Sequence, residues 1–182
     1  MKTESDYTLK RKTFLEGFLD DMKAGKYDYI DSYEYVIVDQ NHKIGITDIA
    51  EVFIQPGPKW FEGLFAIRNK IVALLGLKTK KTILNENDPN RWEPGTQTPI
   101  FKVFGKTDTE IVLGEDDKHL DLRISLLLKQ DTQNTQKKEI VVTTVVKLHN
   151  RLGRYYFFFI KPIHRCFVPL IMKQKFKQLE SR

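Results

Sequence analysis

The chain has 182 residues, with 30 Lys or Arg against 24 Asp or Glu, so its formal charge is +6. A hydrophobic fraction of 41% excludes a disordered chain, and this length allows one domain with a sizeable core. The single cysteine, Cys166, excludes an internal disulfide and a zinc site built from several cysteines. Because the chain starts with polar residues and its most apolar stretch, 155–172, carries charges and prolines, we expect no transmembrane segment and a cytoplasmic protein.

The first part of the chain predicts three helices and one strand. Residues 13–25 repeat apolar side chains at helical spacing, which predicts a short amphipathic helix. Tyrosines and β-branched residues alternate along 29–38, which favours a strand. A short helix at 47–54 and a longer one at 58–76 follow, separated by a Pro-Gly-Pro sequence. The longer helix is apolar on more than one face, so it is buried on several sides or lines a cavity.

The second half predicts a run of strands and a terminal helix. The strand candidates, joined by short connections, are residues 100–104, 110–113, 120–129, 139–148 and 154–160. Sequential strands with short connections form an antiparallel meander. Residues from Pro162 to about Leu179 carry an apolar stripe, so we expect a helix that Pro162 opens and Pro169 kinks.

This order of elements predicts an α+β fold. We expect one domain at residues 28–182, preceded by an N-terminal extension, 1–27, that contains the first short helix. A curved antiparallel sheet of about six to seven strands then wraps on a long C-terminal helix, with two short helices after the first strand. A gap between such a sheet and its helix is the default place for a ligand.

Three segments carry a resemblance to a known family. They are WFEGLFAIRN at 60–69, GEDDKHLDLR at 114–123, and GRYY with KPIHR within 153–165. Together they resemble an uncharacterised bacterial family known only as a domain of unknown function. That family is similar in layout to the helix-grip superfamily, which includes START-like lipid-transfer domains, polyketide cyclases and plant hormone receptors. The resemblance covers about residues 28–178 and implies the fold and a cavity, but no activity.

The densest polar cluster contains the candidate catalytic residues. Strand alternation places His119, Asp121 and Arg123 on one face. If this face looks into the cavity, His119 held by Asp121 acts as a general base and Arg123 binds an anionic or enolate oxygen. If it looks outward, all three are ordinary surface residues. No close-set histidine motif, Gly-rich phosphate loop or dinucleotide fingerprint is present in the sequence, so we predict no metal and no cofactor.

Two ligand-binding candidates lie on the predicted helix 58–76. Arg68 lies on this mainly apolar helix, and a buried arginine needs a carboxylate partner or a ligand. Its candidate partners in the chain are Glu110, Asp116 and Asp121. Trp60 belongs either to the core or to the cavity wall.

Three more candidates lie near the predicted start of the terminal helix. His164 and Arg165 follow Pro162, where free backbone N–H groups favour an anion. Together with Arg154 they would bind a phosphate or carboxylate head group. Alternatively, His164 only caps the helix.

Two functions are compatible with the predicted cavity. The first is a protein that binds an apolar or amphipathic small molecule, and the alternative is an enzyme of the cyclase or hydrolase type that acts on a carbonyl compound. The stretch 155–160 is apolar on both strand faces and needs cover from a helix or from a second subunit, so a homodimer is a further possibility. We recognise no nucleic-acid-binding module and expect no such partner.

The positive charge is concentrated at the C-terminal end. Residues 147–182 hold nine Lys or Arg against Glu180 alone, which leaves 21 against 23 for residues 1–146. Lys173, Lys175 and Lys177 are predicted to form a solvated face that complements the C-terminus of the last helix. Attraction to an anionic ligand or to a membrane surface is the alternative.

Overall fold

The computed structural model describes residues 27–56, 90–131 and 136–181. The helices expected at 13–25 and 58–76 lie outside the described residues, as does the extension 1–27 except for its last residue. The described residues form the sheet, the helix that follows its first strand, and the C-terminal helix.

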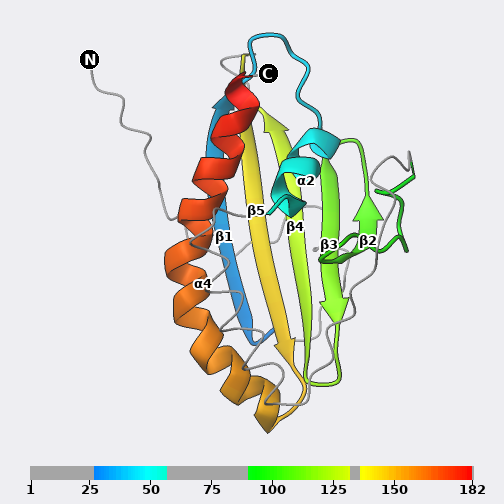
Figure 1. The fold of residues 1–182 in the computed structure, drawn as a ribbon, viewed down its shortest axis with the longest axis vertical. Helices are drawn as coiled ribbons and strands as arrows, with labels where there is room; N and C mark the ends of the chain where they lie inside the picture. Colours follow the sequence, from blue (N-terminus) through cyan, green and yellow to red (C-terminus); the bar gives the residue numbers. More distant parts are fainter. Residues whose placement is uncertain (1–26, 57–89, 132–135, 182) are drawn as a thin grey trace.

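One antiparallel sheet organises the described chain (Figure 1). Its strands are β1 (Tyr29–Val38), β2 (Lys102–Lys106), β3 (Glu110–Asp116), β4 (Leu120–Gln130) and β5 (Lys137–Leu148). Their order is β1-β5-β4-β3-β2, so the last four strands form the predicted meander and the first strand pairs with the last. The described residues contain five strands, which is fewer than the six to seven expected from the sequence.

The strand expected at 154–160 is wrong, because these residues belong to the long helix α4 (Arg151–Lys177). Asn150 caps this helix, since its side chain accepts a hydrogen bond from the backbone N–H of Gly153 at 3.0 Å. The helix therefore starts eleven residues before Pro162, and both Pro162 and Pro169 lie inside it. α4 is visibly bowed in Figure 1, which agrees with the hydrogen bonds that the two prolines remove.

Two helices pack on one face of the sheet. The predicted helix after β1 is confirmed as α2 (Ile46–Ile54), and Ile49 and Val52 on its inner side are fully buried. α4 contributes Ile171 and Phe176 from its C-terminal half. The main hydrophobic core forms between these two helices and the sheet (Figure 1). Among the described residues, no helix is long and apolar enough to cross a membrane.

Lys175 does not belong to a solvated face, although its neighbours Lys173 and Lys177 are exposed. It is 8% exposed, and its Nζ donates to the carbonyl oxygens of Phe53, at 2.8 Å, and of Gln55. These carbonyls lie at the C-terminal end of α2, where helix carbonyls lack partners. Lys175 thus ties α4 to α2, and burial lowers its pKa to about 8 from an ordinary value of 10.5.

The lowered pKa of Lys175 predicts a pH dependence of stability. Between about pH 8 and pH 10.5 the unfolded chain binds this proton and the folded chain does not, so folding stability rises with pH in that window. We expect the free energy of unfolding to rise, relative to that of Lys175→Met, by up to about 1.4 kcal/mol per pH unit. Urea titrations across the window measure it, with Lys177→Met as control. A constant difference between the wild type and Lys175→Met would contradict the prediction.

Candidate functional site

The side chains of β1 that face α4 form a row of tyrosines with one carboxylate among them. Alternation along the strand puts Tyr29, Asp31, Tyr33 and Tyr35 on the same face. Tyr35 identifies this face as the one under α4, because its ring lies 5.3 Å from that of Phe176. The sequence pattern of the tyrosines was therefore correct, but Asp31 within the row was not recognised as a candidate.

Asp31 is held by three side chains through one of its oxygens. Oδ2 accepts hydrogen bonds from the hydroxyls of Tyr29, at 2.5 Å, and of Tyr33, at 3.2 Å. The same oxygen lies 3.1 Å from Nδ1 of His164 in α4. The other oxygen, Oδ1, is buried and has no hydrogen-bond partner among the residues that the structure describes. We call Tyr29, Asp31, Tyr33 and His164 the Asp31 cluster.

The Asp31 cluster keeps its carboxylate charged despite burial. Desolvation alone would raise the pKa of Asp31, but the contact with His164 and the two tyrosine hydroxyls outweigh it and lower that pKa. Burial, together with the nearby carboxylate, raises the pKa values of Tyr29 and Tyr33, so both stay protonated as donors. The cluster therefore offers a fixed negative charge whose second oxygen can accept one more hydrogen bond.

The apolar core side of the sheet adjoins the Asp31 cluster. The register pairs Asp31 with Thr144 of β5, which in turn pairs with Ile124 of β4, so the three share one face of the sheet. The same face carries Leu113, Leu126 and Val142, all of them core residues. A molecule on this face would meet a carboxylate at the β1 edge and aliphatic side chains beyond it.

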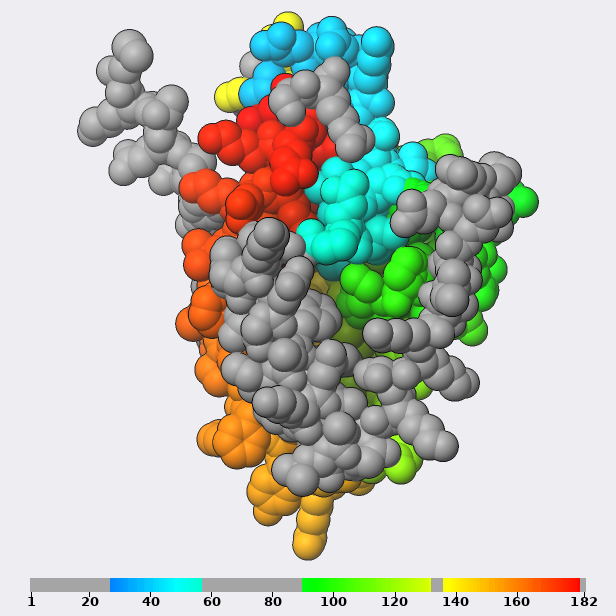
Figure 2. Space-filling model, viewed as in Figure 1, coloured from blue at the N-terminus to red at the C-terminus, as the bar shows by residue number. Residues whose placement is uncertain are grey.

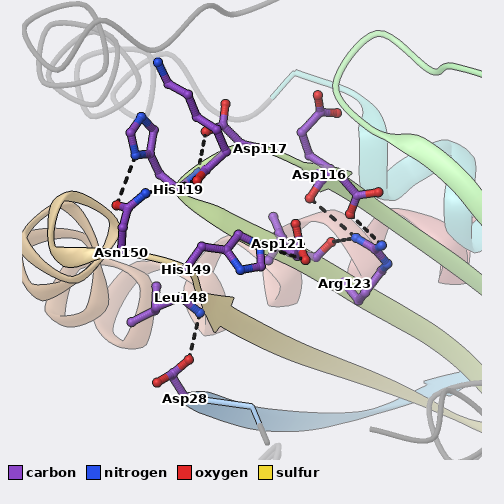
Figure 3. Close-up of polar contacts among 12 residues, drawn as sticks. Asp28, Asp116, Asp117, His119, Asp121, Arg123, Leu148, His149 and Asn150 are labelled. Atoms are coloured by element: carbon purple, nitrogen blue, oxygen red, sulfur yellow. Dashed lines mark hydrogen bonds and ion pairs between the residues drawn. The ribbon is translucent and has the colours of Figure 1, made fainter. Parts of the chain in front are cut away.

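The predicted catalytic residues do not form a triad. Figure 3 shows that each has a different partner: Nδ1 of His119 lies 3.1 Å from Oδ1 of Asn150, and Asp121 pairs with Nε2 of His149 at 2.9 Å. Arg123 pairs with Asp116 at 2.6 Å. Asp121 therefore holds His149 and not His119.

Two of these three residues lie on the face of the sheet that is turned away from α4. Asp121 and Arg123 alternate with Leu122 and Ile124, which face the helices. On the opposite face the guanidinium of Arg123 lies 3.5 Å above the ring of Phe104. The structure thus separates Asp121 and Arg123 from the Asp31 cluster.

The terminal helix does not start at Pro162, so His164 and Arg165 do not lie at its N-terminus as expected. α4 begins at Arg151, so the backbone N–H groups of His164 and Arg165 belong to the interior of a helix and not to its free N-terminus. For the same reason His164 is not the cap. His164 turns toward β1 and completes the Asp31 cluster, while Arg165 is exposed and Arg154 lies 3.8 Å from Asp28. The sequence thus identified His164 as a candidate, but for a different contact.

The two remaining ligand-binding candidates lie outside the described residues. Trp60 and Arg68 lie in the segment 57–89, which is not described. Within the described ranges, no group of three or more His, Cys, Asp or Glu side chains is placed to hold a metal ion. The site is thus defined by the Asp31 cluster and the apolar face beside it.

These features define an α+β protein whose antiparallel sheet carries a buried carboxylate cluster under a long C-terminal helix. The chain belongs to the family described as "Protein of unknown function (DUF2867)", which matches residues 23–171. Neither the curated proteins nor the solved structures contain a match to the chain.

Proposed function

We propose that the protein binds an amphipathic small molecule between the sheet and α4. One observation carries this proposal: Oδ1 of Asp31 is buried without a hydrogen-bond partner among the described residues, beside an apolar face of the sheet. The apolar part of the ligand would lie against the same face of the sheet beside the core, where Leu122 is only partly buried. Its polar end would donate a hydrogen bond to Asp31 from a hydroxyl, an amide or an ammonium group.

The energetics of burial support a role for Asp31 beyond packing. A buried carboxylate is costly even when it is paired, and an apolar side chain in its place is often neutral or stabilising. The two tyrosine hydroxyls donate to Oδ2, and Nδ1 of His164 lies near the same oxygen, which leaves the capacity of Oδ1 unused. The competing explanation is that Asp31 and His164 only fix α4 to β1. That explanation accounts for Oδ2 but gives Oδ1 no role.

The layout adds support to the same proposal. A first strand, a helix, an antiparallel meander and a long C-terminal helix follow one another, and β1 forms the edge of the sheet beside β5. This arrangement is similar to the layout of the helix-grip superfamily, to which we propose to relate the chain. In such a fold the space between sheet and helix holds the ligand. The enzyme alternative is not carried forward, because His119, Asp121 and Arg123 have separate partners.

A displacement assay with three decyl compounds tests the proposed ligand class. The protein is loaded with Nile red, and decanol, decylamine and decanoate compete for the site. We expect decanol and decylamine to displace the dye at lower concentration than decanoate, since only they donate to a carboxylate. In Asp31→Asn this preference should fall by about tenfold or more, because a hydrogen bond to a charged group contributes about 1.5–3 kcal/mol.

Asp121→Asn is the matched control, since it makes the same chemical change on the opposite face of the sheet. It should leave the order of the three competitors unchanged. Circular dichroism and thermal unfolding verify that both variants are folded. If Nile red does not bind, or if decanoate competes as well as decanol, the proposal is contradicted. Native mass spectrometry of protein purified from cells would detect a ligand that is retained.

A further inference from the structure

The exposed side of α4 combines aromatic rings with positive charge. Three aromatic side chains near its start are largely exposed: Tyr155 at 67%, Phe158 at 72% and Phe159 at 58%. The 27 residues of α4 include no Asp or Glu, and their basic residues are Arg151, Arg154, Lys161, Arg165, Lys173, Lys175 and Lys177. All of these except Lys175 are exposed. In Figure 2, α4 lies at the surface along one edge of the molecule.

Phe158 lies on the same face of the helix as three of the cations, and its ring centre is 5.5 Å from that of Phe159, which extends the aromatic patch. Arg154, Lys161 and Arg165 are seven and four residues apart, so they form one row along the helix. Phe158 lies four residues after Arg154 and three before Lys161, which places it beside that row. Phe157 and His164 form the side of the helix that faces β1, where the ring of Phe157 lies 4.9 Å from that of Tyr29.

Little within the described chain neutralises this face. Arg154 is 68% exposed and reaches Asp28 only at 3.8 Å. Lys161 lies 5.3 Å from the ring centre of Tyr29, and neither Lys161 nor Arg165 forms an ion pair with a described residue. Adjacent exposed aromatic side chains that form a contiguous patch are a common sign of an interaction surface.

We propose that this face of α4 docks on an anionic membrane surface. Aromatic residues prefer the boundary between water and lipid, and basic residues beside them are attracted to anionic head groups. A second copy of the chain fits less well, because a two-fold interface would bring the same row of cations from both copies together. A membrane surface would supply an apolar layer for the aromatic rings and negative charge for the cations, which the described part of the chain does not offer to this face.

Co-sedimentation with vesicles tests the proposal. We expect the full chain to bind vesicles of phosphatidylcholine mixed with phosphatidylglycerol, to bind pure phosphatidylcholine weakly, and to be released by salt. Lys161→Gln/Arg165→Gln should bind the anionic vesicles roughly tenfold or more weakly. Phe158→Ser/Phe159→Ser should also lose binding, although it keeps every charge. The control Lys137→Gln/Lys147→Gln removes two exposed cations elsewhere and should retain binding.

Three results would overturn the proposal. The first is a failure of the full chain to bind anionic vesicles. The second is an equal loss in the control variant, which would indicate attraction by net charge alone. The third is a dimer in analytical ultracentrifugation that Phe158→Ser/Phe159→Ser dissociates, which would assign this face to a second copy of the chain. Because none of these readouts involves Asp31 or the decyl compounds, the result is independent of the proposed ligand site.

Discussion

Replacement of Gly153 by Ala is expected to destabilise the protein by about 3 kcal/mol, at the upper end of the range for overpacking. A Cβ at this position would overlap the carbonyl oxygen of His119 and lie 3.0 Å from its carbonyl carbon. Moving that oxygen would break the hydrogen bond that it accepts from the backbone N–H of His149 at 2.9 Å, just beyond the paired ends of β4 and β5. The first turn of α4 and the start of β4 would therefore have to separate.

The sign of this effect distinguishes two physical explanations. Helix propensity alone predicts that Ala is better than Gly inside a helix, by about 1 kcal/mol. Steric overlap predicts the opposite, and a larger effect. Gly45→Ala, at the N-cap of α2, is the matched control, since a Cβ at Gly45 would have no neighbour closer than 3.6 Å. This substitution should destabilise the protein by about 1 kcal/mol or less. Urea unfolding measures both, and a Gly153→Ala variant as stable as the wild type would contradict the contact.

The contacts at the first turn of α4 explain why its start was not predicted. The four residues from Asn150 to Gly153 have the composition of a turn, and the aromatic residues that follow have high β propensity. What makes them helical is tertiary contact. Asn150 caps the helix and at the same time donates to the carbonyl oxygen of Lys118, so the helix start is bound to the strand start. A local sequence pattern does not contain that contact.

The parts of the fold that were predicted correctly have clear local signals. β1 was predicted with its observed bounds from the alternation of its tyrosines, and α2 from the Pro-Gly-Pro sequence that follows it. The site was predicted only in part. His164 contacts Asp31, which is more than 130 residues away in the chain, and Asp121 contacts His149 instead of its neighbour His119. Pairing residues that are close in sequence therefore gave the wrong partner, although an aspartate in an apolar strand face was available as an indication.

Replacement of Phe176 by Ala should have the largest effect on stability among the substitutions considered, about 3–5 kcal/mol. Phe176 is 1% exposed and packs edge-on against the ring of Tyr35, and it belongs to the core between α4, α2 and the sheet. Its removal leaves a cavity at the place where the C-terminal half of α4 is attached. Urea or thermal unfolding should show the loss directly.

Phe158→Ala provides the comparison, because it makes the same change on the same helix at a side chain that is 72% exposed. It should change the free energy of unfolding by about 0.5 kcal/mol or less. Equal effects of the two substitutions would contradict the packing of α4. A large difference would show that one helix has two functionally distinct parts: Phe176 holds the fold together, whereas Phe158 contributes little to stability. Phe158 would then be available for the membrane docking proposed for this face of α4.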